Sequence, residues 1–90
     1  MSEPAPAYTV ELTTAAAREI KKLPRAARER VLDAVDDLAD DPRPHGSRKL
    51  AGREAWRIRI GDYRVIYEIT DSELLVTVIR AANRREVYKK

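Results

Sequence analysis

The chain has 90 residues, 43% of them hydrophobic and 37% charged, which is typical of one small globular domain and excludes a disordered protein. The absence of cysteine excludes disulfides, zinc ribbons and thiol chemistry, and no apolar run approaches the length of a membrane span. Residues 1–50 contain nine basic and nine acidic residues, whereas residues 51–90 contain nine and six, so the net charge of +3 originates in the second part. This uneven basic charge indicates a polyanionic partner, with nucleic acid as the first candidate.

The first part of the chain predicts a tail, a short strand and a helix. Residues Met1–Ala7 (MSEPAPA) are expected to form a flexible tail, which leaves residues 8–90 as a single domain. Apolar and polar residues alternate over YTVEL, residues 8–12, and this pattern predicts a strand. A helix follows over TAAAREIKKL, with Thr13 or Thr14 as its N-terminal cap. No signal-like segment is visible, so we expect a cytoplasmic location.

A second helix is predicted from Arg25 to about Asp40, because apolar residues recur there at helical spacing. Pro24 ends the first helix and suits the first turn of the second, where a missing amide donor costs nothing. The polar stretch DDPRPHGS then predicts a loop, since it combines prolines, a glycine and aspartates.

From Arg48 onward the apolar residues recur every second position, which predicts strands. We expect three consecutive antiparallel strands at residues 56–60, 63–70 and 74–80, and then a polar, basic tail over residues 81–90. One face of these strands is apolar and carries Ile58, Val65, Leu74, Val76 and Val78. The order of elements predicts an α+β fold: an N-terminal strand, two helices, and an antiparallel three-stranded meander with the helices packed on one face.

The stretch WRIRIGDYRVIYEI, residues 56–69, carries the best-defined hairpin signal. Its two alternating runs are separated by Gly61-Asp62, and a two-residue connection with glycine first is typical of a type II′ turn. This register places Arg59 opposite Arg64 and puts both of them, with Arg57, on the face that the helices leave open. Like charges opposite each other on paired strands are destabilising. Because arginine donates bidentate hydrogen bonds to phosphate, we predict an anion-binding face; the alternative is a solvated face whose long side chains cover apolar neighbours.

Three further residues near the C-terminus suit the same partner. Arg84 and Arg85 follow the last predicted strand, and Tyr88 comes shortly after them. A tyrosine stacks on a base or donates a hydrogen bond to a phosphate. If the chain folds back along the sheet edge, these side chains join the arginine cluster. A frayed basic C-terminus is the alternative.

Other candidate sites are weaker. His45 is the sole histidine and is predicted to be a surface loop residue, because no partner for a triad or a metal site is near it in the sequence. Five aspartates between Asp33 and Asp41 match no known metal-binding loop and predict a solvated surface, so we expect no metal site and no cofactor. Four of the five aromatic residues are expected in the core or at its edge: Tyr8, Trp56, Tyr63 and Tyr67.

The stretches KLAG, WRIRIGDYRVIYEI and VIRAANRREVY together resemble the RelE branch of the RelE/ParE toxin superfamily, and the preceding strand and helices match in order and length. The resemblance implies the toxin of a type II toxin–antitoxin module. It implies a metal-free endoribonuclease, an mRNA interferase that enters the ribosomal A site and inhibits translation by cutting messenger RNA. In that reaction a ribose 2′-hydroxyl attacks the adjacent phosphate. The implied partners are a cognate antitoxin, the ribosome with its mRNA, and operator DNA bound by a toxin–antitoxin hetero-oligomer.

The resemblance also implies roles for individual residues. The catalytic set is expected to comprise Arg57, Arg59, Arg64, Arg84 and Tyr88. Arg64 would stabilise the transition state, Arg84 would assist the leaving group, and Tyr88 would orient a nucleotide. Three more residues are expected to add RNA contacts: Lys49, Arg53 and Arg85. The best-known members have a basic residue just before the glycine of the KLAG motif, where this chain has Ala51, and Lys49 or Arg53 could take its place.

Two questions stay open at this point. The best-known members of the family have lysines where this chain has Arg57 and Arg59, and arginine is a poor base at neutral pH, so the general base is unidentified. The second question is the target, because a ParE-like toxin that inhibits DNA gyrase without cleaving RNA shares the fold. A degenerate toxin that survives only as a partner of its antitoxin is a third interpretation. Arg84 and Tyr88 favour the RNA target.

Overall fold

A computed structural model describes residues 7–52 and 54–83 of the chain. The first strand, β1 (Thr9–Leu12), is followed by the helices α1 (Thr14–Lys21) and α2 (Arg25–Asp37). Four more strands come next: β2 (Arg48–Lys49), β3 (Trp56–Ile60), β4 (Tyr63–Thr70) and β5 (Leu75–Asn83), with a short 3₁₀ turn (Asp71–Glu73) before β5. Apart from the two-residue β2 and the 3₁₀ turn, these are the elements that the sequence predicts.

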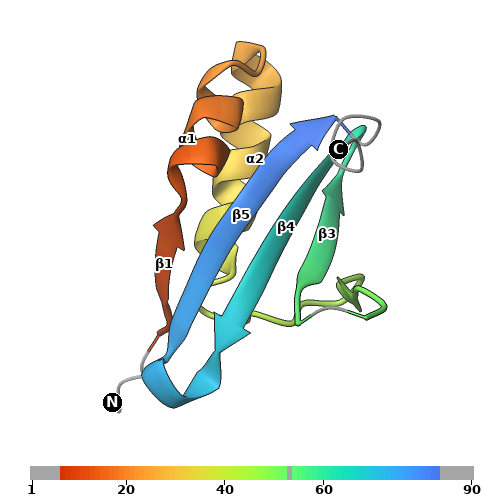
Figure 1. Cartoon of the computed structure of the whole chain (residues 1–90). Helices are drawn as coiled ribbons and strands as arrows, with labels where there is room; N and C mark the ends of the chain where they lie inside the picture. The colour runs from red at the N-terminus through yellow and green to blue at the C-terminus, as the bar shows by residue number, and fades with distance from the viewer. Residues whose placement is uncertain (1–6, 53, 84–90) are drawn as a thin grey trace, which may run out of the picture.

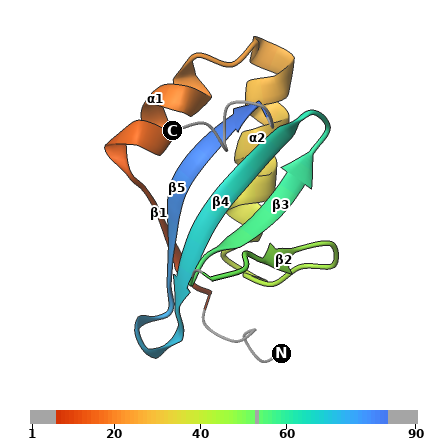
Figure 2. The same ribbon diagram turned by 45° about the vertical axis from the view of Figure 1, so that its right-hand side comes forward.

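The strands form one sheet in the order β1-β5-β4-β3-β2, and both helices cover one of its faces (Figure 1). β3, β4 and β5 form the predicted antiparallel meander, whereas β1 pairs in parallel with β5. β2, labelled in Figure 2, adds an antiparallel edge beside β3. The predicted α+β fold is therefore confirmed, and its sheet is mixed because β1 runs parallel to β5.

The helix boundaries follow from local chemistry. Thr13 caps α1, since its side-chain oxygen accepts a hydrogen bond from the Ala16 amide at 3.1 Å. α2 begins after Pro24 as predicted but ends at Asp37 and not near Asp40. The amides beyond it donate to carbonyls three residues back, as Leu38 does to Val35 at 3.1 Å, so the last turn is tighter than an α-helix. Aspartates are poor helix formers, and the helix dipole disfavours them at this end.

The core lies between the helices and the sheet. Its buried members include Ile20 of α1, and Val31 and Val35 of α2. The opposing sheet residues are Ile58, Val65, Tyr67, Val76, Val78 and Ala81. Tyr67 is fully buried, its hydroxyl donates to the Pro42 carbonyl at 2.7 Å, and burial raises its pKa to about 12. The three other aromatic residues in the described part of the chain, Tyr8, Trp56 and Tyr63, pack against this core as the sequence predicts.

The end of the meander differs from the prediction in two ways. Leu74 was expected on the apolar face, but it is 39% exposed and has a left-handed backbone (φ 51°) after the 3₁₀ turn. The connection between β4 and β5 uses Leu74 to complete this turn, so β5 starts one residue later. β5 also extends to Asn83, which buries Ala81 and Ala82 where a polar tail was predicted.

Candidate anion-binding site

The β3–β4 hairpin has the register that its turn predicts. Arg59 lies opposite Arg64, and Ile58 lies opposite Val65. A type II′ turn requires a positive φ at the first of its two central residues and not at the second. Gly61 has a φ of 60°, and Asp62 is not among the described residues with positive φ. The two-residue turn therefore places Arg57, Arg59 and Arg64 on one face of the sheet.

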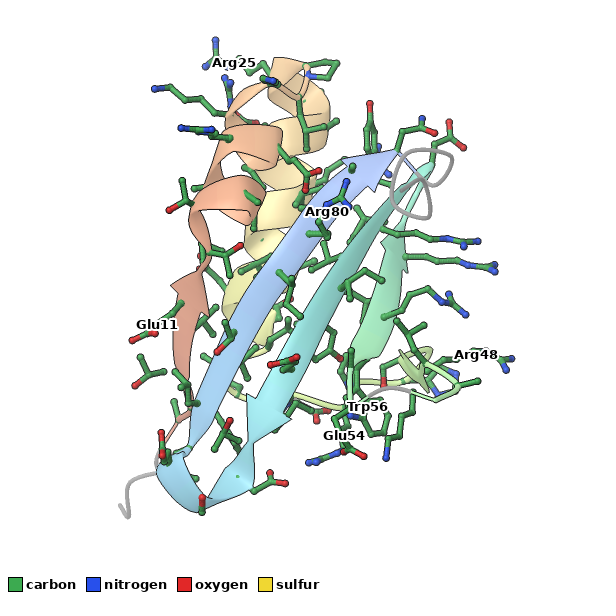
Figure 3. The ribbon with its side chains drawn as sticks, viewed as in Figure 1. Glu11, Arg25, Arg48, Glu54, Trp56 and Arg80 are labelled. Carbon is green, nitrogen blue, oxygen red and sulfur yellow. The ribbon has the colours of Figure 1, made fainter. Side chains whose placement is uncertain are left out.

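A fourth arginine lies on this face, and the sequence pattern did not reveal it. Strict alternation from Val76 and Val78 would turn Arg80 toward the helices. A β-bulge at Ile79 adds one residue to β5, so that Tyr67 pairs with Val78 while Ile66 pairs with Arg80. Ile66 is also opposite Arg57, so Arg80 lies on the same face as Arg57. Figure 3 labels Arg80 on β5. We call the set of Arg57, Arg59, Arg64 and Arg80 the arginine face.

Arg80 is held by α1. Its Nε and Nη2 atoms lie 2.8 and 2.6 Å from Oε2 of Glu19, and the Ala81 amide donates to Oε1 of Glu19 at 2.8 Å. Burial by itself would raise the pKa of Glu19, but the hydrogen bonds from Arg80 and Ala81 and the charge of Arg80 lower it below its ordinary value. Glu19 therefore stays ionised and fixes the C-terminal half of β5.

The arginine face is less open than expected. Arg59 is exposed and Arg64 is half-buried, but Arg57 is only 9% exposed. The reason is a second apolar cluster on this side of the sheet, which consists of Ala55, Ile66 and Ala82 with Leu50 and Ile79 packed against it. Leu50 follows the edge strand β2, and the sequence pattern did not predict this strand. The exposed part of the face is thus nearest the hairpin turn.

Among the other residues predicted to contact RNA, the structure describes Lys49. Lys49 pairs opposite Trp56, which faces the helices, and its Nζ lies 3.5 Å from Glu54. Its neighbour Arg48 pairs opposite Arg57 and so belongs to the side of the arginine face. Arg53, Arg84, Arg85 and Tyr88 lie outside the described residues, as does most of the predicted N-terminal tail. The described part of β5 ends at Asn83, opposite Tyr63 and next to the Arg64–Ala82 pair.

A surface depression of about 360 Å³ borders the arginine face at the outer edge of β3. It is lined by Arg57, Ile58 and Arg59 of β3, by Arg48 of β2, and by His45 and Gly46 from the loop before β2. His45 is exposed, as predicted for a loop residue, but it is not isolated from the arginines. The sequence did not reveal that His45 lies near Arg57 and Arg59, because the loop comes close to β3 only through the pairing of β2 with β3.

The described residues contain no group of three or more histidines, cysteines or acidic residues that could hold a metal ion. None of the described helices is long and apolar enough to cross a membrane. The arginine face itself supplies guanidinium groups, which bind phosphate and stabilise negative charge that develops on it.

Comparisons with known proteins agree with this architecture. A family model described as the ParE toxin of the type II toxin–antitoxin system parDE matches residues 10–88. The toxin RelG of Mycobacterium tuberculosis is 36% identical over 87 residues, covering 92% of this chain and 98% of RelG.

Solved structures give the same result. The toxin–antitoxin complex RelBE2 of M. tuberculosis contains a chain with a TM-score of 0.78 and 30% identity, covering 94% of this chain and 100% of that one. A chain of the intact RelBE toxin–antitoxin complex of E. coli matches with a TM-score of 0.76 and 26% identity, over 86% of this chain and 96% of that one.

Proposed function

The chain belongs to the RelE/ParE superfamily of type II toxin–antitoxin toxins, and from this premise we propose that it is a ribosome-dependent endoribonuclease that cleaves messenger RNA without a metal. The observation that carries the proposal is the clustering of arginines on one side of the sheet, with Arg59 directly opposite Arg64. Mutual repulsion makes this arrangement unfavourable for the free protein, and an RNA phosphate between the side chains removes the repulsion.

In the proposed reaction the ribose 2′-hydroxyl attacks the adjacent phosphate and expels the 5′-oxygen. Arg59 and Arg64 stabilise the negative charge that builds up on the phosphate oxygens, and Arg57 holds the phosphate from the buried side of the site. Arg84 assists the leaving oxygen and Tyr88 orients a nucleotide, as the family resemblance implies. Lys49, Arg53 and Arg85 bind flanking RNA.

The proposed partners follow from the family. Several of the matched structures are complexes of a toxin with its antitoxin, so we propose that a cognate antitoxin neutralises this chain. We also propose that acidic residues of the antitoxin cover the arginine face, and that the hetero-oligomer binds operator DNA. Because the substrate is messenger RNA on translating ribosomes, the site of action is the cytoplasm.

The alternative is a ParE-like toxin that inhibits DNA gyrase; the family model that matches this chain is itself described as a ParE toxin. Induced expression followed by mapping of messenger RNA ends on translating ribosomes separates the two. Cuts between positions of the A-site codon support the endoribonuclease. Intact RNA together with trapped gyrase–DNA complexes refutes it and supports the alternative.

Arg64→Ala tests the arginine face itself. We expect cleavage to fall by about 10²–10³, the usual loss when a charge-stabilising donor is removed. Thermal stability should stay level or rise, because the substitution relieves the repulsion from Arg59. Arg25→Ala is the matched control: Arg25 is an exposed arginine of α2 whose Nε lies 3.3 Å from Glu29, and its loss should leave cleavage unchanged. A folded Arg64→Ala protein of full toxicity would exclude the arginine face as the active site.

A further inference from the structure

The proposed reaction needs a group that accepts the 2′-hydroxyl proton, and the arginine face supplies none. Guanidinium groups remain protonated at any pH at which the protein works, so none of its four members can act as a base. This inference rests on the proposed function, and it concerns the depression at the edge of β3.

His45 lies in this depression together with two members of the arginine face. The lining comes from two parts of the chain: Arg57, Ile58 and Arg59 on β3, and His45, Gly46 and Arg48 before β3. The ionisable side chains that line it besides His45 are Arg48, Arg57 and Arg59, and no carboxylate is among them. A phosphodiester held by these guanidiniums would therefore lie beside the imidazole.

The loop that carries His45 is anchored on its N-terminal side. The Tyr67 hydroxyl donates to the Pro42 carbonyl at 2.7 Å. Arg43 binds both carboxylate oxygens of Asp71, at 2.9 and 3.2 Å, and its guanidinium lies over the Trp56 ring at 5.2 Å from the centroid. These contacts tie the loop to β3, to β4 and to the turn before β5.

A tight turn then sets the position of His45. The Ser47 amide donates to the Pro44 carbonyl at 2.9 Å, so His45 and Gly46 are the two central residues of a four-residue turn. Gly46 has a φ of 94°, which is the conformation that the third position of a type II turn requires. After the turn, Arg48 pairs with Arg57 on β3. The backbone on both sides of His45 is thus fixed against the strand that carries Arg57 and Arg59.

We propose that His45 is the general base of the cleavage reaction. The neutral imidazole takes the proton of the 2′-hydroxyl while the 2′-oxygen forms a bond to phosphorus and the bond from phosphorus to the 5′-oxygen breaks. Water protonates the leaving 5′-oxygen, and His45 returns its proton to solvent. The products are a 2′,3′-cyclic phosphate and a 5′-hydroxyl end, so atoms and charge balance without a cofactor. Arg57 and Arg59 neutralise the phosphate throughout.

The test is single-turnover cleavage of messenger RNA on programmed ribosomes by the full chain, across a pH series from about 5 to 8, where imidazoles titrate. We expect His45→Gln to cleave about 10²–10⁴-fold more slowly than wild type, the usual contribution of a positioned acid or base. The wild-type rate should rise with pH, because only the neutral imidazole accepts a proton, and the variant should lose this rise. Ribosome binding and thermal stability should not change.

Chemical rescue by imidazole provides a second, independent test of His45. His45→Gly should regain cleavage when imidazole is added, and the rescue should increase with the neutral imidazole concentration. A His45→Gln protein that cleaves at the wild-type rate with the wild-type pH profile would overturn the assignment of His45 and leave the endoribonuclease proposal intact. A wild-type protein that does not cleave at all would overturn both.

Discussion

Glu19 is the residue that most directly joins the helical layer to the arginine face. Its carboxylate accepts hydrogen bonds from the Arg80 side chain and from the Ala81 amide, beyond the point where β1 stops pairing with β5. The amide would otherwise be an unsatisfied donor at a partly buried sheet edge. Glu19 therefore stabilises β5 and at the same time sets the direction of Arg80.

Replacing Glu19 by glutamine should lower the free energy of unfolding by about 1–2 kcal/mol at pH 7, since it weakens hydrogen bonds to a charged group. The pKa of Glu19 is lowered in the folded protein, so its stabilising effect is complete above the ordinary pKa and is lost as pH falls through the folded value. Urea unfolding at pH 7 and at about pH 3, below the ordinary glutamate pKa, should show a larger difference between the proteins at the higher pH. The control Glu29→Gln, in an exposed pair with Arg25, should change stability by less than about 0.5 kcal/mol. Equal effects of the two substitutions would contradict this account.

The element that links α1 to the bulge in β5 is the N-terminal cap. The Thr13 side-chain oxygen accepts from the Ala16 amide at 3.1 Å and donates to the carbonyl of Ile79, the bulge residue, at 3.2 Å. The Thr13 amide also donates to the Val78 carbonyl at 3.0 Å. One residue therefore starts the helix and satisfies the backbone at the bulge, where the strand changes which face its side chains occupy.

Thr13→Ala should lower the free energy of unfolding by about 1–2 kcal/mol, the usual cost of removing a threonine cap. Thr14→Ala is the matched control, because Thr14 is exposed and lies within α1, and it should stay within about 0.5 kcal/mol of wild type. Guanidinium unfolding measures both. If the two variants are equally stable, the cap does not contribute as the geometry indicates.

Charge is segregated along the molecule, which measures 43 × 32 × 24 Å. Residues 18–30 contain six basic side chains, and residues 33–41 contain five aspartates and no basic residue. The basic residues of the first of these segments reach the hairpin turn. Arg30 packs so close to Gly61 that a Cβ atom added to this glycine would lie 2.8 Å from Nη2 of Arg30. Arg25 at the α1–α2 turn marks this basic segment in Figure 3. The equal numbers of charges in the first 50 residues therefore conceal a dipolar arrangement.

Binding to RNA or to ribosomes should weaken steeply with salt, because phosphate contacts release counterions. With roughly three to five contacts, the plot of log K against log salt concentration should have a slope of about −2 to −4. Arg59→Gln should make the slope shallower by about 0.7, the value of one single-strand contact, whereas Arg25→Gln should leave it unchanged. Filter binding at several salt concentrations measures these slopes. A slope near zero would argue for a protein target.

The sequence by itself determined what depends on neighbouring residues. The Gly61-Asp62 turn set the register of Arg59 against Arg64, because a two-residue turn allows one pairing of the strands that flank it. Apolar spacing identified the helices and their buried faces, and Thr13 and Pro24 marked where they begin. The family resemblance also rested on such contiguous stretches.

Only the tertiary structure decided which residues meet across long separations. The bulge at Ile79 moves Arg80 to the face that strict alternation would not give it. Leu50, which follows β2, packs against the apolar cluster that includes Ile66, the residue opposite Arg57. His45 likewise approaches Arg57 and Arg59 only because β2 pairs with β3. These contacts are set by packing between distant segments, which a local periodicity does not encode.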